Sequence, residues 1–204
     1  MKVLIISDGH GAVDQLDALA DVAKASDIVL FGGDFAAVGH PETGLPFLKR
    51  LAALHDRVFA VTGNCDEPLF RETVEEYDLS IEASLSYFSG LMLAGSGGGS
   101  RFTGTTPNER TDEELASDLR LASLAAGGVS WEDDPDDDAE GDDAEVDDGA
   151  GRAATRTAVA TAPKTALAGE VLEEPWNNLI IIAHNPPKDT KLDAVAPGVH
   201  VGSP

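Results

Sequence analysis

Short apolar runs of β type alternate with segments of helical spacing over the first half of the chain. Each run is followed by a loop that contains glycine or a turn-forming polar residue, and each loop leads into a helical segment. Such alternation predicts an α/β fold in which parallel strands are joined by right-handed crossovers. The predicted strands are residues 2–7, 28–31 and 58–61, and the predicted helices cover about 16–23, 46–54 and 67–76.

The second half of the chain predicts a strand pair, a helix and one late strand. Residues 84–87 and 91–95 should pair through a turn at Ser89-Gly90, and a glycine-dense loop follows at 95–99. Thr111 and Glu114 have the spacing of a capping box, so a helix should begin there and run through about 115–124. Residues 178–183 form the clearest late strand.

The charge of the chain adds an acidic insertion to this picture. The 204 residues include 37 Asp and Glu against 14 Lys and Arg, which gives a net charge of −23. Of the 17 positions from 132 to 148, 12 are acidic, and such a run repels itself and buries little apolar surface. We therefore expect one domain over residues 1–204, interrupted by a disordered insertion at about 126–151.

The acidity of the chain and the shortness of its apolar runs also limit the partners that the protein could bind. An acidic surface repels the phosphate backbone of nucleic acids, so we expect no non-specific nucleic-acid binding. Few Lys and many Asp indicate a halophilic protein, because high salt screens the repulsion between carboxylates. The apolar runs are far shorter than the roughly 20 residues that span a bilayer, and no signal peptide is recognisable. We expect a cytoplasmic protein with no membrane partner.

Metal-binding side chains lie at the ends of four predicted strands. Cys65 is the single cysteine, which excludes a site built from several thiolates, so oxygen and imidazole would hold any metal. The carboxyl ends of strands in an α/β sheet meet at one edge, where these side chains would gather. This mixture of ligands suits Mn²⁺, Fe or Zn²⁺ better than Mg²⁺. The candidate ligands are Asp8, His10, Asp34, Asn64 and His184.

Four short motifs occur in order along the chain: Asp8-Gly9-His10, Gly33-Asp34, Gly63-Asn64-Cys65-Asp66 and His184. In this order they resemble the DxH, GD, GN(H/C)(D/E) and H motifs of calcineurin-like metallophosphoesterases. The stretches TPNE at 106–109, HNPP at 184–187 and GVHVGS at 198–203 are similar to the branch described as Icc-related predicted phosphoesterases. The resemblance covers about 1–124 and 178–204, and it implies an α/β sandwich of two β-sheets flanked by helices.

The resemblance also implies a metal site and a reaction. Asp8 and His10 would hold one divalent cation, Asn64 and His184 a second, and Asp34 would bridge the two. Manganese is the first choice of metal, with iron and zinc as alternatives. A hydroxide shared by the cations would hydrolyse a small phosphorylated substrate, either a phosphodiester or an activated phosphomonoester. The predicted catalytic residues are Asn64, Cys65 and Asp66.

The sequence departs from the family pattern in two places. Relatives continue to a GHxH motif that supplies two further ligands, whereas this sequence stops at Pro204, so we expect the C-terminal part of the domain to be missing. Cys65 stands where many members have a histidine that protonates the leaving group. A thiol is the weaker proton donor at neutral pH, which predicts a preference for phosphodiesters or for leaving groups of low pKa.

Other interpretations remain open for the same residues. Asp8, Asp34 and Asn64 could be turn or capping residues, and His184 could be a structural histidine, although five such coincidences would be needed. A non-catalytic scaffold with this fold, or an acidic salt-adapted binding protein, would retain the fold without the chemistry. The sequence assigns no role to His200.

Overall fold

A computed structural model describes residues 1–102, 104–125, 178–188, 190–196, 199–200 and 202. These belong to one compact unit, Met1–Gly128 with Pro175–Pro204. The acidic insertion predicted at 126–151 lies outside the described residues.

The first sheet is parallel and has β2 at its centre, as the alternating pattern predicted. The strand order is β1-β2-β3, and both neighbours of β2 run parallel to it. All four residues of β2 are buried, which is typical of a strand covered on both faces. The elements of this part are β1 (Val3–Ile6), α1 (Val13–Ala18), α2 (Ala20–Lys24), β2 (Ile28–Phe31), the 3₁₀ helix η1 (Pro41–Thr43), α3 (Gly44–Leu54), β3 (Val58–Ala60) and α4 (Phe70–Glu76).

The second sheet has the order β4-β5-β8 and contains the predicted strand pair. β4 (Ser86–Phe88) and β5 (Leu91–Ser96) are antiparallel, and β8 (Leu179–Ala183) is parallel to β5. Ser89 and Gly90, which join β4 to β5, have φ values of 50° and 82°. Positive φ at both central residues suits the right-handed twist of a two-residue hairpin.

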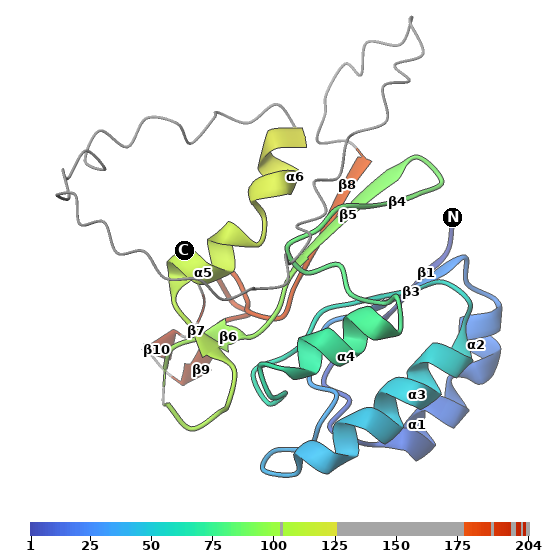
Figure 1. Cartoon of the computed structure of the whole chain (residues 1–204), viewed down its shortest axis with the longest axis horizontal. Helices are drawn as coiled ribbons and strands as arrows, with labels where there is room; N and C mark the ends of the chain where they lie inside the picture. The colour runs from blue at the N-terminus through green and yellow to red at the C-terminus, as the bar shows by residue number, and fades with distance from the viewer. Residues whose placement is uncertain (103, 126–177, 189, 197–198, 201, 203–204) are drawn as a thin grey trace, which may run out of the picture. The chain divides into compact units, whose positions relative to one another are not determined.

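Alternate residues of β2 face two separate cores, and this makes the fold a sandwich. Val29 and Phe31 belong to a cluster with residues of α1, α3 and α4. Ile28 and Leu30 belong to another cluster with residues of β5 and β8. Figure 1 shows α1, α2 and α3 on the side of the first sheet away from β5 and β8. The α/β sandwich of two β-sheets with flanking helices is therefore confirmed.

Two predicted helices are each split in the structure. The capping box at Thr111 and Glu114 is confirmed, since each side chain accepts the backbone N–H of the other residue. The helix that it begins is interrupted between α5 (Asp112–Ser117) and α6 (Arg120–Ala125), where Leu119 N–H donates to Ala116 O, three residues back. The predicted helix over 16–23 is interrupted in the same way, where Leu19 N–H donates to Leu16 O. These 3₁₀-type bonds tighten the chain and divide each segment.

The remaining elements are β6 (Gly99–Ser100), β7 (Glu109–Arg110), β9 (Ala194–Ala196) and β10 (Val199–His200).

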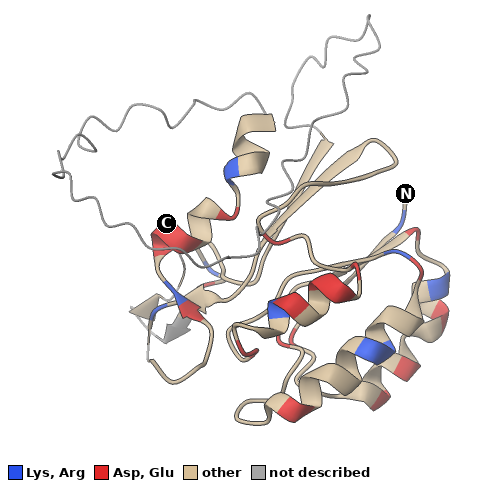
Figure 2. Cartoon of the chain, viewed as in Figure 1, with Lys and Arg blue, Asp and Glu red and all other residues tan. Residues whose placement is uncertain are grey.

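The described surface carries the acidity of the sequence on its helices. Figure 2 shows acidic residues along α4 and α5, whose sequences are FRETVEE and DEELAS. None of the helices in the described part of the chain has the length and apolarity that crossing a membrane requires.

We expect Phe47→Ala to destabilise the fold by about 3–5 kcal/mol, because it removes a ring from a close-packed aromatic cluster. Phe47 is 1% exposed, and its ring centroid lies 5.4 Å from that of Phe31. Urea denaturation measures the change. Phe102→Ala is the matched control, because Phe102 is 57% exposed and its loss should change stability by less than about 0.5 kcal/mol. Equal losses of stability in the two variants would contradict the assignment of Phe47 to a close-packed aromatic core.

Candidate metal centre

The loops that follow β1 and β2 are joined by backbone hydrogen bonds beyond the ends of the strands. Asp8 N–H donates to Gly33 O at 3.0 Å, and His10 N–H donates to Asp34 O at 2.8 Å. Because β1 and β2 are adjacent and parallel, both loops leave the same edge of the sheet. The side chains of Asp8 and His10 are thereby fixed next to that of Asp34, more than 20 residues away in the sequence.

The carboxylate of Asp34 lies between two histidines. Asp34 is 3% exposed, and its Oδ2 is 3.6 Å from His10 Nε2. Its other oxygen, Oδ1, is 3.6 Å from His184 Nε2 and accepts the N–H of Cys65 at 2.9 Å. One buried carboxylate therefore faces an imidazole nitrogen through each of its oxygens, which is the arrangement that a bridging ligand requires.

Backbone carbonyls orient both imidazole rings toward Asp34. His184 Nδ1 is 2.7 Å from Gly32 O, and His10 Nδ1 is 3.4 Å from Ala36 O. A carbonyl can only accept, so each Nδ1 carries the hydrogen, and Nε2 of the neutral ring keeps a lone pair. Metal-binding histidines are commonly oriented in this way by a backbone carbonyl on the other nitrogen.

The side chains of His184 and Asn64 meet through two acceptor atoms. His184 Nε2 is 2.8 Å from Asn64 Oδ1, and Asp34 Oδ1 is the third acceptor beside them. Acceptors at this separation repel one another unless a proton or a cation lies between them. Nitrogen and oxygen donors of this kind fit a divalent cation such as Mn²⁺, Fe²⁺ or Zn²⁺. His184, Asn64 and Asp34 could hold such an ion.

Asp8 and Cys65 lie on the other side of the cluster, beside His10. Asp8 Oδ1 is 4.0 Å from His10 Nε2, and the Asp8 side chain is 62% exposed. Among the described residues, Cys65 forms with His10 and Asp34 a group whose possible ligand atoms lie within 4.8 Å of one another. The sequence analysis did not include Cys65 among the ligands. Burial, and then the nearby Asp34 carboxylate, raise the pKa of the Cys65 thiol to about 12, so it is a neutral thiol at physiological pH.

Three of the candidate ligands have left-handed backbone conformations. The φ values are 56° for Asp8, 44° for His10 and 62° for Asp34. Residues other than glycine rarely adopt positive φ, and they do so in turns, as at Ser89, and at functional sites. Gly33 leaves space for the ring of His184, because a Cβ on Gly33 would lie 2.6 Å from His184 Nδ1.

Asp66, which the sequence predicted to be catalytic, directs its carboxylate at backbone amides. It is fully buried and accepts the N–H groups of Phe35 at 3.2 Å, Ala36 at 2.8 Å and Gly63 at 2.8 Å. Burial raises the pKa of Asp66, and these hydrogen bonds oppose the change. The contacts favour a positioning role, because Asp66 ties the loop after β2 to the loop that carries Asn64.

Asn108 is a further positioning residue, to which the sequence analysis gave no role. Its side chain donates to Gly63 O at 3.1 Å and to Thr62 Oγ1 at 3.3 Å, and its own N–H donates to Asn64 O at 3.1 Å. Asn108 is 8% exposed. It therefore holds in place the loop that presents Asn64. The sequence signal for Asn108 was the TPNE stretch at 106–109, which resembled a family branch but indicated no role for this residue.

Glu109, the last residue of that stretch, binds the loop before it. Its carboxylate accepts N–H groups from Phe102 at 3.0 Å and Gly104 at 2.8 Å, and the hydroxyl of Thr106 at 3.1 Å. These donors, with Gly104 first among them, lower the pKa of Glu109 to about 2. Phe102 and residues 104–106 are thus held by one ionised side chain.

His200, which the sequence left without a role, pairs with a buried carboxylate. Its Nδ1 is 2.8 Å from Asp193 Oδ1, and Asp193 is 0% exposed. Thr190 N–H also donates to Asp193 Oδ1, at 3.0 Å. This pair stabilises the segment after His184.

The fold and the cluster together define an α/β sandwich with a candidate binding site for divalent cations at the carboxyl edge of its first sheet. The sequence profile described as calcineurin-like phosphoesterase matches residues 1–194. The chain therefore belongs to the calcineurin-like phosphoesterase family, as its motifs predicted. This is a family of phosphoester hydrolases that bind divalent metals.

Two known proteins are similar to this chain. An uncharacterized protein of Methanocaldococcus jannaschii, MJ1162, is 29% identical over 121 residues, which cover 58% of this chain and 53% of that protein. The crystal structure of TT1561 of Thermus thermophilus is similar with a TM-score of 0.52 at 14% identity, over 62% of this chain and 63% of that one. The second likeness concerns the fold alone. The chain spans about half the length of the curated relative that it matches.

We expect the order of residues 104–106 to depend on pH through Glu109. The pKa of Glu109 falls from 4.5 to about 2 on folding, so its stabilising contribution is complete above about pH 4.5 and is lost as the pH falls toward 2. Amide hydrogen-exchange protection factors of Gly104 and Thr106 should decrease over that range. Glu109→Gln should show the low protection already at neutral pH.

Glu113→Gln is the matched control, because Glu113 is an exposed acidic residue in the first turn of α5. This substitution should leave the protection factors at Gly104 and Thr106 unchanged. Full protection in Glu109→Gln at neutral pH would show that the loop does not need the carboxylate.

Proposed function

We propose that this chain hydrolyses phosphate esters with two divalent cations bound around Asp34. The observation that carries the proposal is the buried Asp34 carboxylate, whose two oxygens each lie 3.6 Å from the Nε2 atom of a different histidine. Asp8 and His10 would hold one cation, Asn64 and His184 the other, and Asp34 both. Membership of the family supports a metal-dependent phosphoesterase.

The residues around the cluster keep the ligands ready for binding. Gly32 O fixes the His184 ring, and Asn108 fixes the loop of Asn64. Asp66 holds the two ligand-bearing loops together through backbone amides. When bound, the cations would neutralise phosphate charge and lower the pKa of the attacking water. We propose manganese, because carboxylate, imidazole and amide donors suit it, with iron and zinc as alternatives.

Cys65 bears on which esters are hydrolysed. It follows Asn64 directly, and it shares with His10 and Asp34 the group of atoms within 4.8 Å. A thiol whose pKa is raised to about 12 protonates an alkoxide less readily than a histidinium does. We therefore propose phosphodiesters, or phosphomonoesters with leaving groups of low pKa, as the substrates.

We expect Asp34→Asn to reduce both Mn²⁺ affinity and hydrolysis of bis-p-nitrophenyl phosphate. The loss should exceed the about 10–100-fold that removal of an outer partner of a metal ligand costs, because Asp34 would contact both cations. Titration calorimetry measures binding and p-nitrophenolate release measures the rate. His184→Ala should lower both as well.

His55→Ala is the matched control for the histidine substitution. The His55 ring contacts Ser26 O and Arg57 O, away from the cluster, so metal binding and rate should stay unchanged. If the unaltered chain binds two cations but releases no p-nitrophenolate, the result would favour the non-catalytic scaffold. If it binds no divalent cation, the proposed site is wrong.

We expect the rate to fall as the leaving-group pKa rises across a series of aryl and alkyl phosphates, because Cys65 supplies little protonation. Cys65→His should flatten this dependence by adding a better proton donor. Cys65→Ala is the control and should keep the steep dependence. Rates that are independent of leaving-group pKa in the unaltered chain would remove this part of the proposal.

A further inference from the structure

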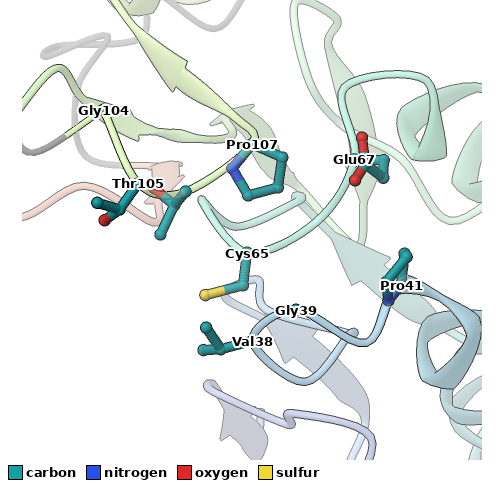
Figure 3. Close-up of a pocket in the computed structure, with 9 residues that line it drawn as sticks. Val38, Gly39, Pro41, Cys65, Glu67, Gly104, Thr105 and Pro107 are labelled. Carbon is teal, nitrogen blue, oxygen red and sulfur yellow. The ribbon is translucent and has the colours of Figure 1, made fainter.

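A cavity of about 260 Å³ opens beside Cys65. One wall comes from the loop after β2, the opposite wall from the loop between β6 and β7, and Cys65 lies between them. Figure 3 shows Cys65 in the middle of the lining, with Val38 and Pro107 on opposite sides of it in this view. The side chains that shape the cavity are Val38, Pro41, Cys65, Glu67, Thr105, Thr106 and Pro107.

Cys65 connects this cavity to the candidate metal centre. It lines the cavity, and its Sγ lies within 4.8 Å of possible ligand atoms of His10 and Asp34. A phosphate ester bound at that centre would lie beside the cavity, which one of its ester oxygens could then reach. The group attached to that oxygen is the part of a substrate that would enter.

The walls match a small group without negative charge. Val38, Pro41 and Pro107 present apolar surface, and Thr106 contributes a hydroxyl. None of the described residues lining the cavity is Lys or Arg, and Glu67 contributes a carboxylate. A second phosphate or a carboxylate on the entering group would find no cation to pair with and one anion to repel it. The volume is below the roughly 300–1,000 Å³ of a pocket for a whole drug-sized molecule, so the entering group is small.

Both walls are fixed before any ligand binds. Thr106 is held through its hydroxyl to Glu109, whose carboxylate also accepts the N–H of Gly104. On the other side, Thr43 Oγ1 accepts the N–H of Ala37 and donates to His40 O, which closes the turn that contains Val38. A preformed cavity loses little entropy on binding and therefore selects by shape and charge.

We propose that this cavity binds the esterified alcohol of the substrate, and that this alcohol is a small uncharged group such as a single aromatic ring. This inference rests on the proposed function, because it places the phosphate at the candidate metal centre. Esters whose alcohol carries another anionic group should bind less tightly, because the lining has a carboxylate at Glu67 and no Lys or Arg. Val38 and Glu67 determine this specificity.

Titration calorimetry on the full chain in excess Mn²⁺ tests the inference with three probes: inorganic phosphate, 4-fluorophenyl phosphate and 4-carboxyphenyl phosphate. Burial of the ring should make the fluorophenyl ester bind about tenfold more tightly than inorganic phosphate. The carboxylate should make the third probe about fivefold weaker than the fluorophenyl ester, because repulsion by an exposed Glu67 is modest.

Two substitutions locate these effects in the cavity. Val38→Trp should fill the cavity and remove the advantage of the fluorophenyl ester, with inorganic phosphate unchanged. Val22→Trp is the matched control, because Val22 is an exposed valine on α2, and it should change nothing. Glu67→Lys should abolish or reverse the discrimination against the carboxyphenyl ester, and Glu67→Gln should reduce it.

The results separate this inference from the proposed function. If inorganic phosphate binds with Mn²⁺ but the fluorophenyl ester binds no more tightly, the cavity assignment is wrong and the metal site stands. The same conclusion follows if Val38→Trp does not change the affinity for the fluorophenyl ester. If Glu67→Lys leaves the discrimination unchanged, the charge selectivity is wrong. If no probe binds in the presence of Mn²⁺, both the site and the cavity assignment are overturned.

Discussion

The buried carboxylate of Asp66 is the interaction on which the geometry of the candidate site depends. It accepts amide hydrogens from the loop after β2 and from the loop after β3, so it sets the separation of the segments that carry Asp34 and Asn64. A buried carboxylate is costly unless its oxygens are satisfied, and here three N–H groups satisfy them. The cost of burying the charge is offset only when both loops adopt their native conformations, which couples the two loops to each other.

The sandwich explains why such a site can be rigid. β2 is buried on both faces, with Val29 and Phe31 in one core and Ile28 and Leu30 in the other. A strand held in two cores has no freedom to shift, so the loop that follows it begins from a fixed point. Asp34 lies three residues beyond the end of this strand.

The sequence predicted the strands of the first sheet, the hairpin and the late strand, because their apolar runs and turn residues are local signals. It also predicted that the candidate ligands would meet, but not that His184 would come from a strand of the second sheet, β8. It did not predict the split helices, which depend on single i to i−3 hydrogen bonds at Leu19 and Leu119. Nor did it find the partners of Asp66 and Glu109: most of these are backbone amides, and amides leave no mark in a pattern of side chains.

The left-handed backbones at Asp8, His10 and Asp34 have a consequence for the evolution of this chain. Glycine would relieve the torsional penalty at each position, so selection for thermodynamic stability alone would replace all three. A role of these side chains in metal binding would explain why they stand where glycine would cost less. Drift in a lineage that no longer needed those side chains would be expected to begin at these three positions.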